Sequence, residues 1–237
     1  MFHTTPDGLK IYYRRIKGKK PTLVFLHGLA EDHTTFKYVS KAFSDHSQLL
    51  IDLRGHGKSS KPHGRAYYLP ERLLDDVKEI IHKEKLKNFN VIGFSLGGYL
   101  AIQIKGAKKV IAINPPFGRT SMKLYFKVLL WLSKFVPETI LKLFEKQGDL
   151  FNYAGLIDAY ITRRLNTPPY VDLNILDNLL ALERTQICDH FILIKSTQDE
   201  LVHDSPVGNF KQYRVKGHHN VIAENPNDII AHLKQLL

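Results

Sequence analysis

A serine between two glycines is the first group in this sequence that could do chemistry. It lies in the stretch 90–101, NVIGFSLGGYLA, where Gly93, Ser95 and Gly97 form a G-x-S-x-G pattern. A strand-like apolar run precedes the pattern and a helix-like run follows it, so Ser95 is predicted to stand on a sharp strand-to-helix turn. Glycines two residues before and after the serine leave room for the strand and the helix to pass each other. In this context the pattern is typical of a nucleophilic serine.

A serine hydroxyl needs a general base, and the base needs an acid to orient it. Asp199 directly follows the strand-like stretch FILIKSTQ, and this position favours it over the nearby Glu200 and Asp204. Two adjacent histidines, His218 and His219, follow the next strand-like stretch, YRVKG. The residues themselves leave both histidines open as the base.

Other reactive groups give weaker signals. The chain has 12 histidines, but none is paired in an H-x-x-x-H or H-E-x-x-H pattern on a predicted helix, so we expect no metal and no cofactor. Cys188 precedes a buried strand and is expected to be a small core residue. A single cysteine cannot form an internal disulfide, which favours a reducing compartment, and we expect a cytoplasmic protein.

The elements that must position these residues alternate along the chain. Strand-like stretches are LKIYYRR, PTLVFLHG, QLLIDLRGHG, NFNVIGF, KKVIAINPP, HFILIKSTQDE and FKQYRVKG. Helical spacing of apolar residues occurs at 32–46, at 69–84, after Ser95 and in the closing stretch PNDIIAHLKQLL. Strands alternating with helices predict an α/β fold with a parallel sheet covered on both faces.

Residues 117–184 interrupt this alternation. The segment is predicted to be mostly helical, is rich in leucine and aromatic residues, and contains no buried strand. We therefore expect a core domain made of residues 1–116 and 185–237, with a helical lid inserted at 117–184.

The whole pattern resembles the α/β-hydrolase family. The resemblance rests on FLHGLAEDHTTF, LLIDLRGHGKSS, VIGFSLGGYLA, ILIKSTQDELV and GHHNVIAENP, and it covers nearly all of the 237 residues. It implies a mostly parallel eight-stranded sheet flanked by helices, with the lid after the sixth strand. It also implies hydrolysis of a carboxylic ester through an acyl-enzyme, without a cofactor.

The resemblance assigns roles to particular residues. Ser95 is expected to be the nucleophile, and Asp199 the acid. The family pattern H-x-x-x-x-E-x-P, counted back from Glu224 and Pro226, selects His219 as the base. His218 then stands where a glycine is usual. Some relatives carry the acid after the sixth strand, but Asn114, which ends that strand here, cannot hold a negative charge.

The resemblance also implies an oxyanion hole and a substrate. The backbone N–H groups of Leu29 and Leu96 are expected to hold the oxyanion, whereas His27, Arg54 and His56 are expected to be structural. Phe94 and the lid residues Phe126 and Trp131 are expected to contact a small acyl or ester substrate with an apolar part. Acyl transfer, lactone hydrolysis, carbon–carbon bond hydrolysis and a receptor role with little turnover remain open.

The net charge of +11 raises the question of an anionic partner. The lysines are scattered and no nucleic-acid-binding motif accompanies them, so we do not expect nucleic acid as a partner. The longest apolar run near the middle, VLLWL, is too short to cross a bilayer, and we expect no stable membrane insertion. The start of the sequence shows no apolar signal region, which argues against secretion by that route. The sequence leaves the oligomeric state open.

Overall fold

The computed structural model describes residues 1–117, 167–181, 191–202 and 210–237. The strands are β1 (Phe2–Thr4), β2 (Lys10–Ile16), β3 (Lys20–Leu26), β4 (His46–Ile51), β5 (Phe89–Phe94), β6 (Lys109–Ile113), β7 (Ile192–Ser196) and β8 (Lys211–Val215). The α-helices are α1 (Lys37–Ala42), α2 (Pro70–Lys83), α3 (Leu96–Ala101), α7 (Pro169–Ala181), α8 (Val221–Glu224) and α9 (Pro226–Leu236). Two 3₁₀ turns, η1 (His33–Phe36) and η2 (Arg65–Tyr68), complete the described elements.

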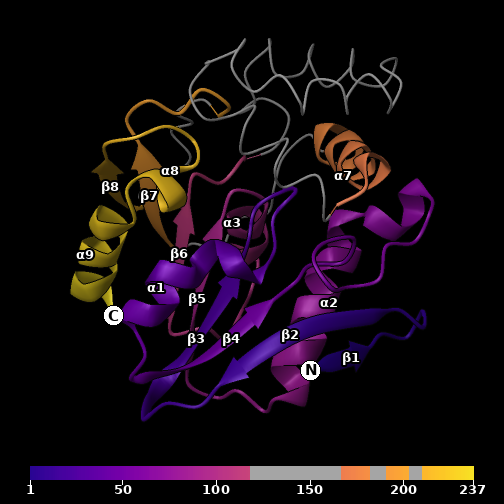
Figure 1. Cartoon of the computed structure of the whole chain (residues 1–237), viewed down its shortest axis with the longest axis horizontal. Coiled ribbons are helices and arrows are strands. Elements are labelled where there is room, and N and C mark those ends of the chain that lie inside the picture. The colour runs from indigo at the N-terminus through magenta and orange to yellow at the C-terminus, as the bar shows by residue number, and fades with distance from the viewer. Residues whose placement is uncertain (118–166, 182–190, 203–209) are drawn as a thin grey trace.

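The eight strands form one sheet in the order β1-β2-β4-β3-β5-β6-β7-β8 (Figure 1). All pairs from β4 to β8 are parallel, whereas β2 pairs antiparallel with both β1 and β4. The prediction of a mostly parallel eight-stranded sheet flanked by helices is therefore confirmed. The three-residue β1 was not among the strand-like stretches, because three residues are too few for a periodic signal.

The central strands are buried on both faces, as their continuous apolar sequences predict. Along β3, Leu23 and Phe25 pack with one core cluster and Val24 and Leu26 with another. The first cluster also contains side chains of α1 and α9, and the second contains side chains of α2, α3 and α7. The sheet is thus covered by helices on both sides, and its carboxyl-terminal edge gathers the loops after the strands (Figure 1).

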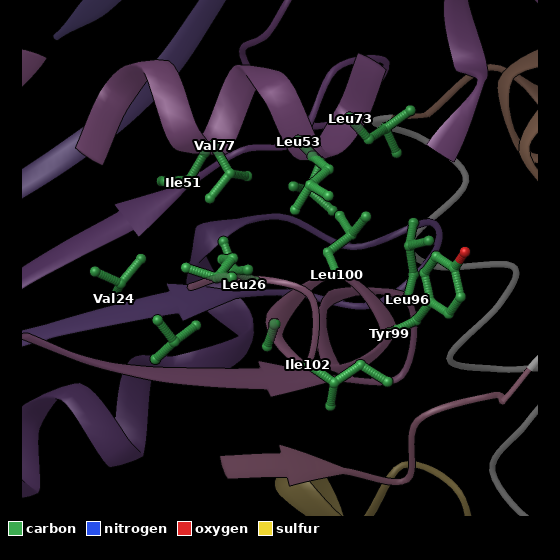
Figure 2. Packing of buried hydrophobic residues seen from close by; sticks show 14 of the residues in the cluster. Val24, Leu26, Ile51, Leu53, Leu73, Val77, Leu96, Tyr99, Leu100 and Ile102 are labelled. Atoms are coloured by element: carbon green, nitrogen blue, oxygen red, sulfur yellow. The ribbon is translucent and has the colours of Figure 1, made fainter. Parts of the chain in front are cut away.

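Helix α2 confirms the helix predicted at 69–84. Pro70 begins the helix, where its missing N–H costs nothing. Leu73, Val77 and Ile80 are fully buried. Figure 2 shows Leu73 and Val77 pointing from the helix toward the sheet, where Ile51 lies. The helix therefore packs in the same core cluster as Val24 and Leu26 of β3 and Ile51 of β4.

The helix at 32–46 is shorter than the length predicted from the spacing of its apolar residues. The side chain of Asp32 accepts the N–H of Thr34 and starts a 3₁₀ turn, and only residues Lys37–Ala42 are α-helical. The N–H of Phe43 then bonds to both Val39 and Ser40, and its carbonyl accepts the N–H of His46. These local bonds end the helix and start β4.

Of the predicted lid, the structure describes Phe117 and residues 167–181. Helix α7 packs Val171, Ile175 and Leu179 into the core cluster of α2, and Arg65 Nε donates to Asn178 Oδ1 at 2.7 Å. Residues 118–166 and 182–184 lie outside the described residues, so the division into core and lid stays a prediction. None of the described helices is long and apolar enough to cross a membrane.

Candidate active site

Ser95 stands between the last residue of β5 and the first residue of α3, on the turn that the sequence predicted. Its backbone has φ 50° and ψ −117°, a region that residues with a side chain rarely adopt. Such a conformation costs about 1–3 kcal/mol and persists only where the surroundings hold it. Here the N–H of Ser95 bonds to Ile113 at 2.8 Å, and its carbonyl accepts the N–H of Tyr99 at 2.9 Å.

The glycines around Ser95 are required by close backbone contacts. A Cβ on Gly93 would lie 2.1 Å from the carbonyl oxygen of Gly97, and a Cβ on Gly97 would lie 2.0 Å from that of Leu26. Real Cβ atoms do not approach backbone so closely. The two glycines therefore let β3, β5 and α3 meet beneath Ser95.

Three side chains from distant parts of the sequence form one hydrogen-bonded chain. His219 Nε2 lies 2.9 Å from Ser95 Oγ, and His219 Nδ1 lies 3.0 Å from Asp199 Oδ1. Because the Asp199 carboxylate can only accept a hydrogen bond, Nδ1 carries the ring proton, and Nε2 is left to accept a hydrogen bond from the hydroxyl of Ser95. His219 and Asp199 are 6% and 7% exposed. The structure thus brings together the three residues singled out from the sequence.

Asp199 is held as a carboxylate. Burial alone would raise its pKa, but the charges and hydrogen bonds of His219 and Lys195 outweigh burial and lower the pKa. Its Oδ1 also accepts the N–H groups of Leu201 and Val202, each at 3.0 Å. These bonds fix the carboxylate while it faces the imidazole.

His219 is held through its backbone as well as its ring. Asn114 Nδ2 donates to the carbonyl oxygen of His219 at 2.8 Å, and Asn114 Oδ1 accepts the N–H of Ser196 at 2.8 Å. Glu200 Oε2 accepts the N–H of His219 at 3.0 Å. The ring of Phe94 lies 5.4 Å from the imidazole, centroid to centroid. Strand ends β5, β6 and β7 therefore all help to orient this histidine.

The neighbouring His218 has different partners. Its N–H donates to Glu224 Oε2 at 2.9 Å, its Nδ1 lies 3.3 Å from the same oxygen, and its side chain is 37% exposed. The structure therefore brings His219, and not His218, to Ser95.

The loop after β3 is braced in the way expected for His27. The N–H of Leu53 donates to His27 Nε2 at 3.0 Å, so Nδ1 carries the proton and donates to the carbonyl of Gly28 at 2.7 Å. Glu31 Oε2 accepts the N–H of Gly28 at 3.0 Å. Within the described part of the chain, the N–H groups of Leu29 and Leu96 donate no hydrogen bond. That leaves both available as donors, and their role stays a prediction.

Arg54 and His56 lie in the turn after β4 and are both buried, which agrees with structural roles. Arg54 forms two hydrogen bonds of 2.6 and 2.7 Å with Asp76 and a third of 2.9 Å with Asp7. Burial lowers the pKa of His56 to about 3, and the nearby His27 adds to this effect. His56 is therefore neutral at pH 7, and its 3.8 Å approach to Asp172 of α7 is not a contact between two charges.

The remaining predicted substrate contacts are only partly described. Phe94 is 2% exposed and packs behind His219 in the core, so its contact with substrate stays a prediction. Phe126, Trp131 and Cys188 lie outside the described residues.

Sequence reasoning missed Lys195 and underrated Asn114. Lys195 is the one charged residue within FILIKS, a stretch that otherwise reads as a buried strand, and this mismatch was a usable signal.

One group of side chains has the ligand types of a metal site. Single ligand atoms of Asp32, His33 and Asp52 lie within 4.8 Å of one another. Asp52 Oδ1 accepts the N–H of His33 and faces its Nδ1, both at 2.7 Å, and Asp52 Oδ2 accepts the N–H of Lys58 at 2.9 Å. These bonds give Asp52 a role in holding the loops around β4.

Comparison with known proteins supplies a family. The sequence model of the alpha/beta hydrolase family matches residues 23–232. A 2-succinyl-6-hydroxy-2,4-cyclohexadiene-1-carboxylate synthase of Escherichia coli is 37% identical over 86 residues, which are 35% of this chain and 31% of that protein. A putative esterase/lipase of Haemophilus influenzae is 38% identical over 85 residues, or 35% of this chain and 29% of that protein.

Solved structures extend the likeness to the whole fold. The enol-lactonase of Burkholderia xenovorans superposes with a TM-score of 0.79 at 15% identity, covering 99% of this chain and 98% of the other. At this identity the likeness concerns the fold alone. The matches to the two curated relatives each span less than a third of the relative's length.

Proposed function

Because the chain belongs to the alpha/beta hydrolase family, we propose that it is a serine hydrolase that cleaves a carboxylic ester, or a related acyl compound, through an acyl-enzyme on Ser95. The observation that carries the proposal is the hydrogen-bonded chain from Ser95 through His219 to Asp199. A hydroxyl, an imidazole and a carboxylate in this order are the groups that make a serine nucleophilic.

In the first half of the reaction, Ser95 Oγ attacks the substrate carbonyl carbon while His219 Nε2 takes the hydroxyl proton. The carbonyl oxygen becomes an oxyanion, which the N–H groups of Leu96 and Leu29 stabilise. Asp199 stabilises the imidazolium that forms. The tetrahedral intermediate then collapses, and His219 gives its proton to the departing alkoxide, so an alcohol leaves and an acyl-Ser95 ester remains.

In the second half, water replaces the alcohol. His219 Nε2 takes a proton from the water, whose oxygen attacks the acyl carbon. The second oxyanion uses the same two N–H donors. Collapse of this intermediate returns the proton from His219 to Ser95 Oγ and releases the carboxylic acid.

The placement of the three residues supports their proposed roles. With Ser95 on a positive-φ turn, its Oγ stands at the carboxyl-terminal edge of the sheet, where His219 also lies. Asp199 follows β7 and His219 follows β8, so the proposed acid and base lie in the loops after two adjacent parallel strands. The loops between these strand ends are the usual place for ligands in open α/β sheets.

A panel of p-nitrophenyl esters of increasing acyl length, measured with wild type and Ser95→Ala, tests the proposal. We expect turnover by the wild type and a loss of at least about 1,000-fold in Ser95→Ala. A lactone and an acyl acceptor other than water belong in the same panel, because both reactions use the same acyl-enzyme. Absence of turnover with every ester and lactone would overturn the proposal.

A further inference from the structure

A lysine lies buried behind the proposed catalytic acid. Lys195 is the fourth residue of β7 and is 4% exposed. Its Nζ donates to Asp199 Oδ2 at 2.9 Å and to the carbonyl oxygen of Val202 at 3.1 Å. A buried ammonium group is costly unless it is paired and hydrogen-bonded. Both partners of Lys195 belong to the turn that presents Asp199 to the base.

The two oxygens of Asp199 face different partners. Oδ1 lies 3.0 Å from His219 Nδ1, and Oδ2 accepts the ammonium of Lys195. One carboxylate is thus shared between a lysine side chain and a histidine that must gain and lose a proton during the reaction. We infer that Lys195 is a positioning residue that fixes Asp199 and sets the pH at which His219 becomes available as a base. This inference rests on the proposed function.

The direction of the effect follows from the signs of the charges. An imidazolium at His219 is attracted by Asp199 and repelled by the ammonium of Lys195. Lys195 therefore offsets part of the attraction between Asp199 and the imidazolium. Removing the positive charge should move the acidic limb of the pH–rate profile toward higher pH.

Other charged and polar groups around the pair remain in place in that experiment. Glu200 bonds to the N–H of His219, and Glu224 bonds to His218 on the same turn. The side chain facing the site from β6 is the neutral Asn114. A change confined to Lys195 leaves these groups unaltered, so the shift reports the lysine charge.

A merely structural lysine would give a different result. Through Val202, Lys195 also holds the turn after β7, and loss of that bond alone would lower the free energy of unfolding without moving the pH profile. Lys195→Gln removes the charge and keeps an N–H donor. Lys195→Arg keeps the charge. Lys211→Met removes an exposed lysine at the far end of the neighbouring strand β8 and serves as the matched control.

The test is the pH dependence, from pH 4.5 to 9, of kcat/KM with a p-nitrophenyl ester and of the rate of fluorophosphonate labelling. We expect the acidic limb of Lys195→Gln to shift upward by about one pH unit, with a plateau within about threefold of wild type. Lys195→Arg and Lys211→Met should keep the wild-type midpoint. In an Asp199→Asn background only the direct repulsion between Lys195 and His219 is left, so Lys195→Gln should shift the midpoint by less. Lys195→Met takes the place of the Gln variant should that variant fail to fold.

Unchanged profiles in Lys195→Gln or Lys195→Met, or an equal shift in Lys195→Arg, would overturn the role of Lys195 while leaving the proposed hydrolase in place. A wild-type protein that neither turns over an ester nor reacts with the phosphonate would overturn the proposed function, and the inference with it. A shift of undiminished size in the Asp199→Asn background would show that Lys195 acts on His219 directly and not through Asp199.

Discussion

The side-chain amide of Asn114 donates a 2.8 Å hydrogen bond to the backbone carbonyl of His219, although 105 residues separate the two in the sequence. Asn114 is fully buried, follows β6 directly and also accepts the N–H of Ser196 at the end of β7. One side chain therefore ties two strand ends to the turn that carries the proposed base.

We predict that Asn114→Ala lowers kcat/KM by about 10- to 100-fold, because a small displacement of a general base is costly to catalysis. The loss of a buried acceptor should also lower the free energy of unfolding by about 1–3 kcal/mol. Asn90→Ala removes another buried asparagine, at the start of β5, and should leave kcat/KM unchanged. Ester kinetics and urea unfolding measure both effects. An unchanged kcat/KM in folded Asn114→Ala would show that Asn114 contributes to stability but not to catalysis.

The two adjacent histidines give a test of register. His219 Nε2 lies 2.9 Å from Ser95 Oγ, whereas His218 pairs with Glu224. His219→Ala should slow fluorophosphonate labelling by at least about 1,000-fold, and His218→Ala should stay within about threefold of wild type. Gel-based labelling rates at fixed pH measure both. The reverse pattern would show that the wrong histidine has been assigned.

Gly97 and Gly98, which follow Ser95, differ in the free space around them. A Cβ on Gly97 would lie 2.0 Å from the carbonyl oxygen of Leu26, while one on Gly98 would lie 3.1 Å from its nearest neighbours. We predict that Gly97→Ala lowers the free energy of unfolding by more than about 3 kcal/mol or prevents folding, and that Gly98→Ala costs about 1 kcal/mol. Soluble yield and urea unfolding measure the difference. Equal costs would contradict the close contact at Gly97.

Buried His56 should make stability depend on pH. Burial holds its pKa at about 3 in the folded protein, against 6.5 for an exposed histidine. Between these values the unfolded chain binds one more proton than the folded one at this residue. Its contribution to stability is therefore fully present above pH 6.5 and is lost as the pH falls below that.

Urea unfolding of wild type and His56→Gln at pH 7.5 and pH 5 measures this dependence. The wild type should lose about 2 kcal/mol more than the variant over this interval. His82→Gln removes an exposed histidine and should lose as much as the wild type. Equal pH dependence in wild type and His56→Gln would show that His56 is not the source.

The parts of the site that the sequence predicted are those with a local signal. The G-x-S-x-G pattern that predicts the turn at Ser95 spans only five residues. Asp199 and His219 each follow the end of a strand. The choice between His218 and His219 came from the family resemblance, whose pattern H-x-x-x-x-E-x-P is counted back from Glu224 and Pro226. Seven of the eight strands correspond to strand-like stretches. The stretches of β3 to β7 are mainly apolar and buried, whereas β2 and β8 also carry exposed polar residues.

The parts that escaped depend on which strands become neighbours. Asn114 meets Ser196 and His219 only because β6 lies beside β7 in the sheet. Lys195 was counted as part of a strand, and nothing local to it shows that its ammonium reaches back to Asp199. The early helix was overestimated because apolar spacing at 32–46 does not reveal the capping bonds of Asp32 and Phe43.

The measurement that tests the central claim most directly is the site of covalent labelling by a fluorophosphonate. Intact-mass analysis of the native wild type should give one adduct per chain, and peptide mapping should place it on Ser95. Native Ser95→Ala and urea-unfolded wild type should give none, because the first lacks the hydroxyl and the second lacks the bond to His219. Absence of an adduct on the native wild type, or an adduct that persists in Ser95→Ala, would contradict the assignment of Ser95 as the nucleophile.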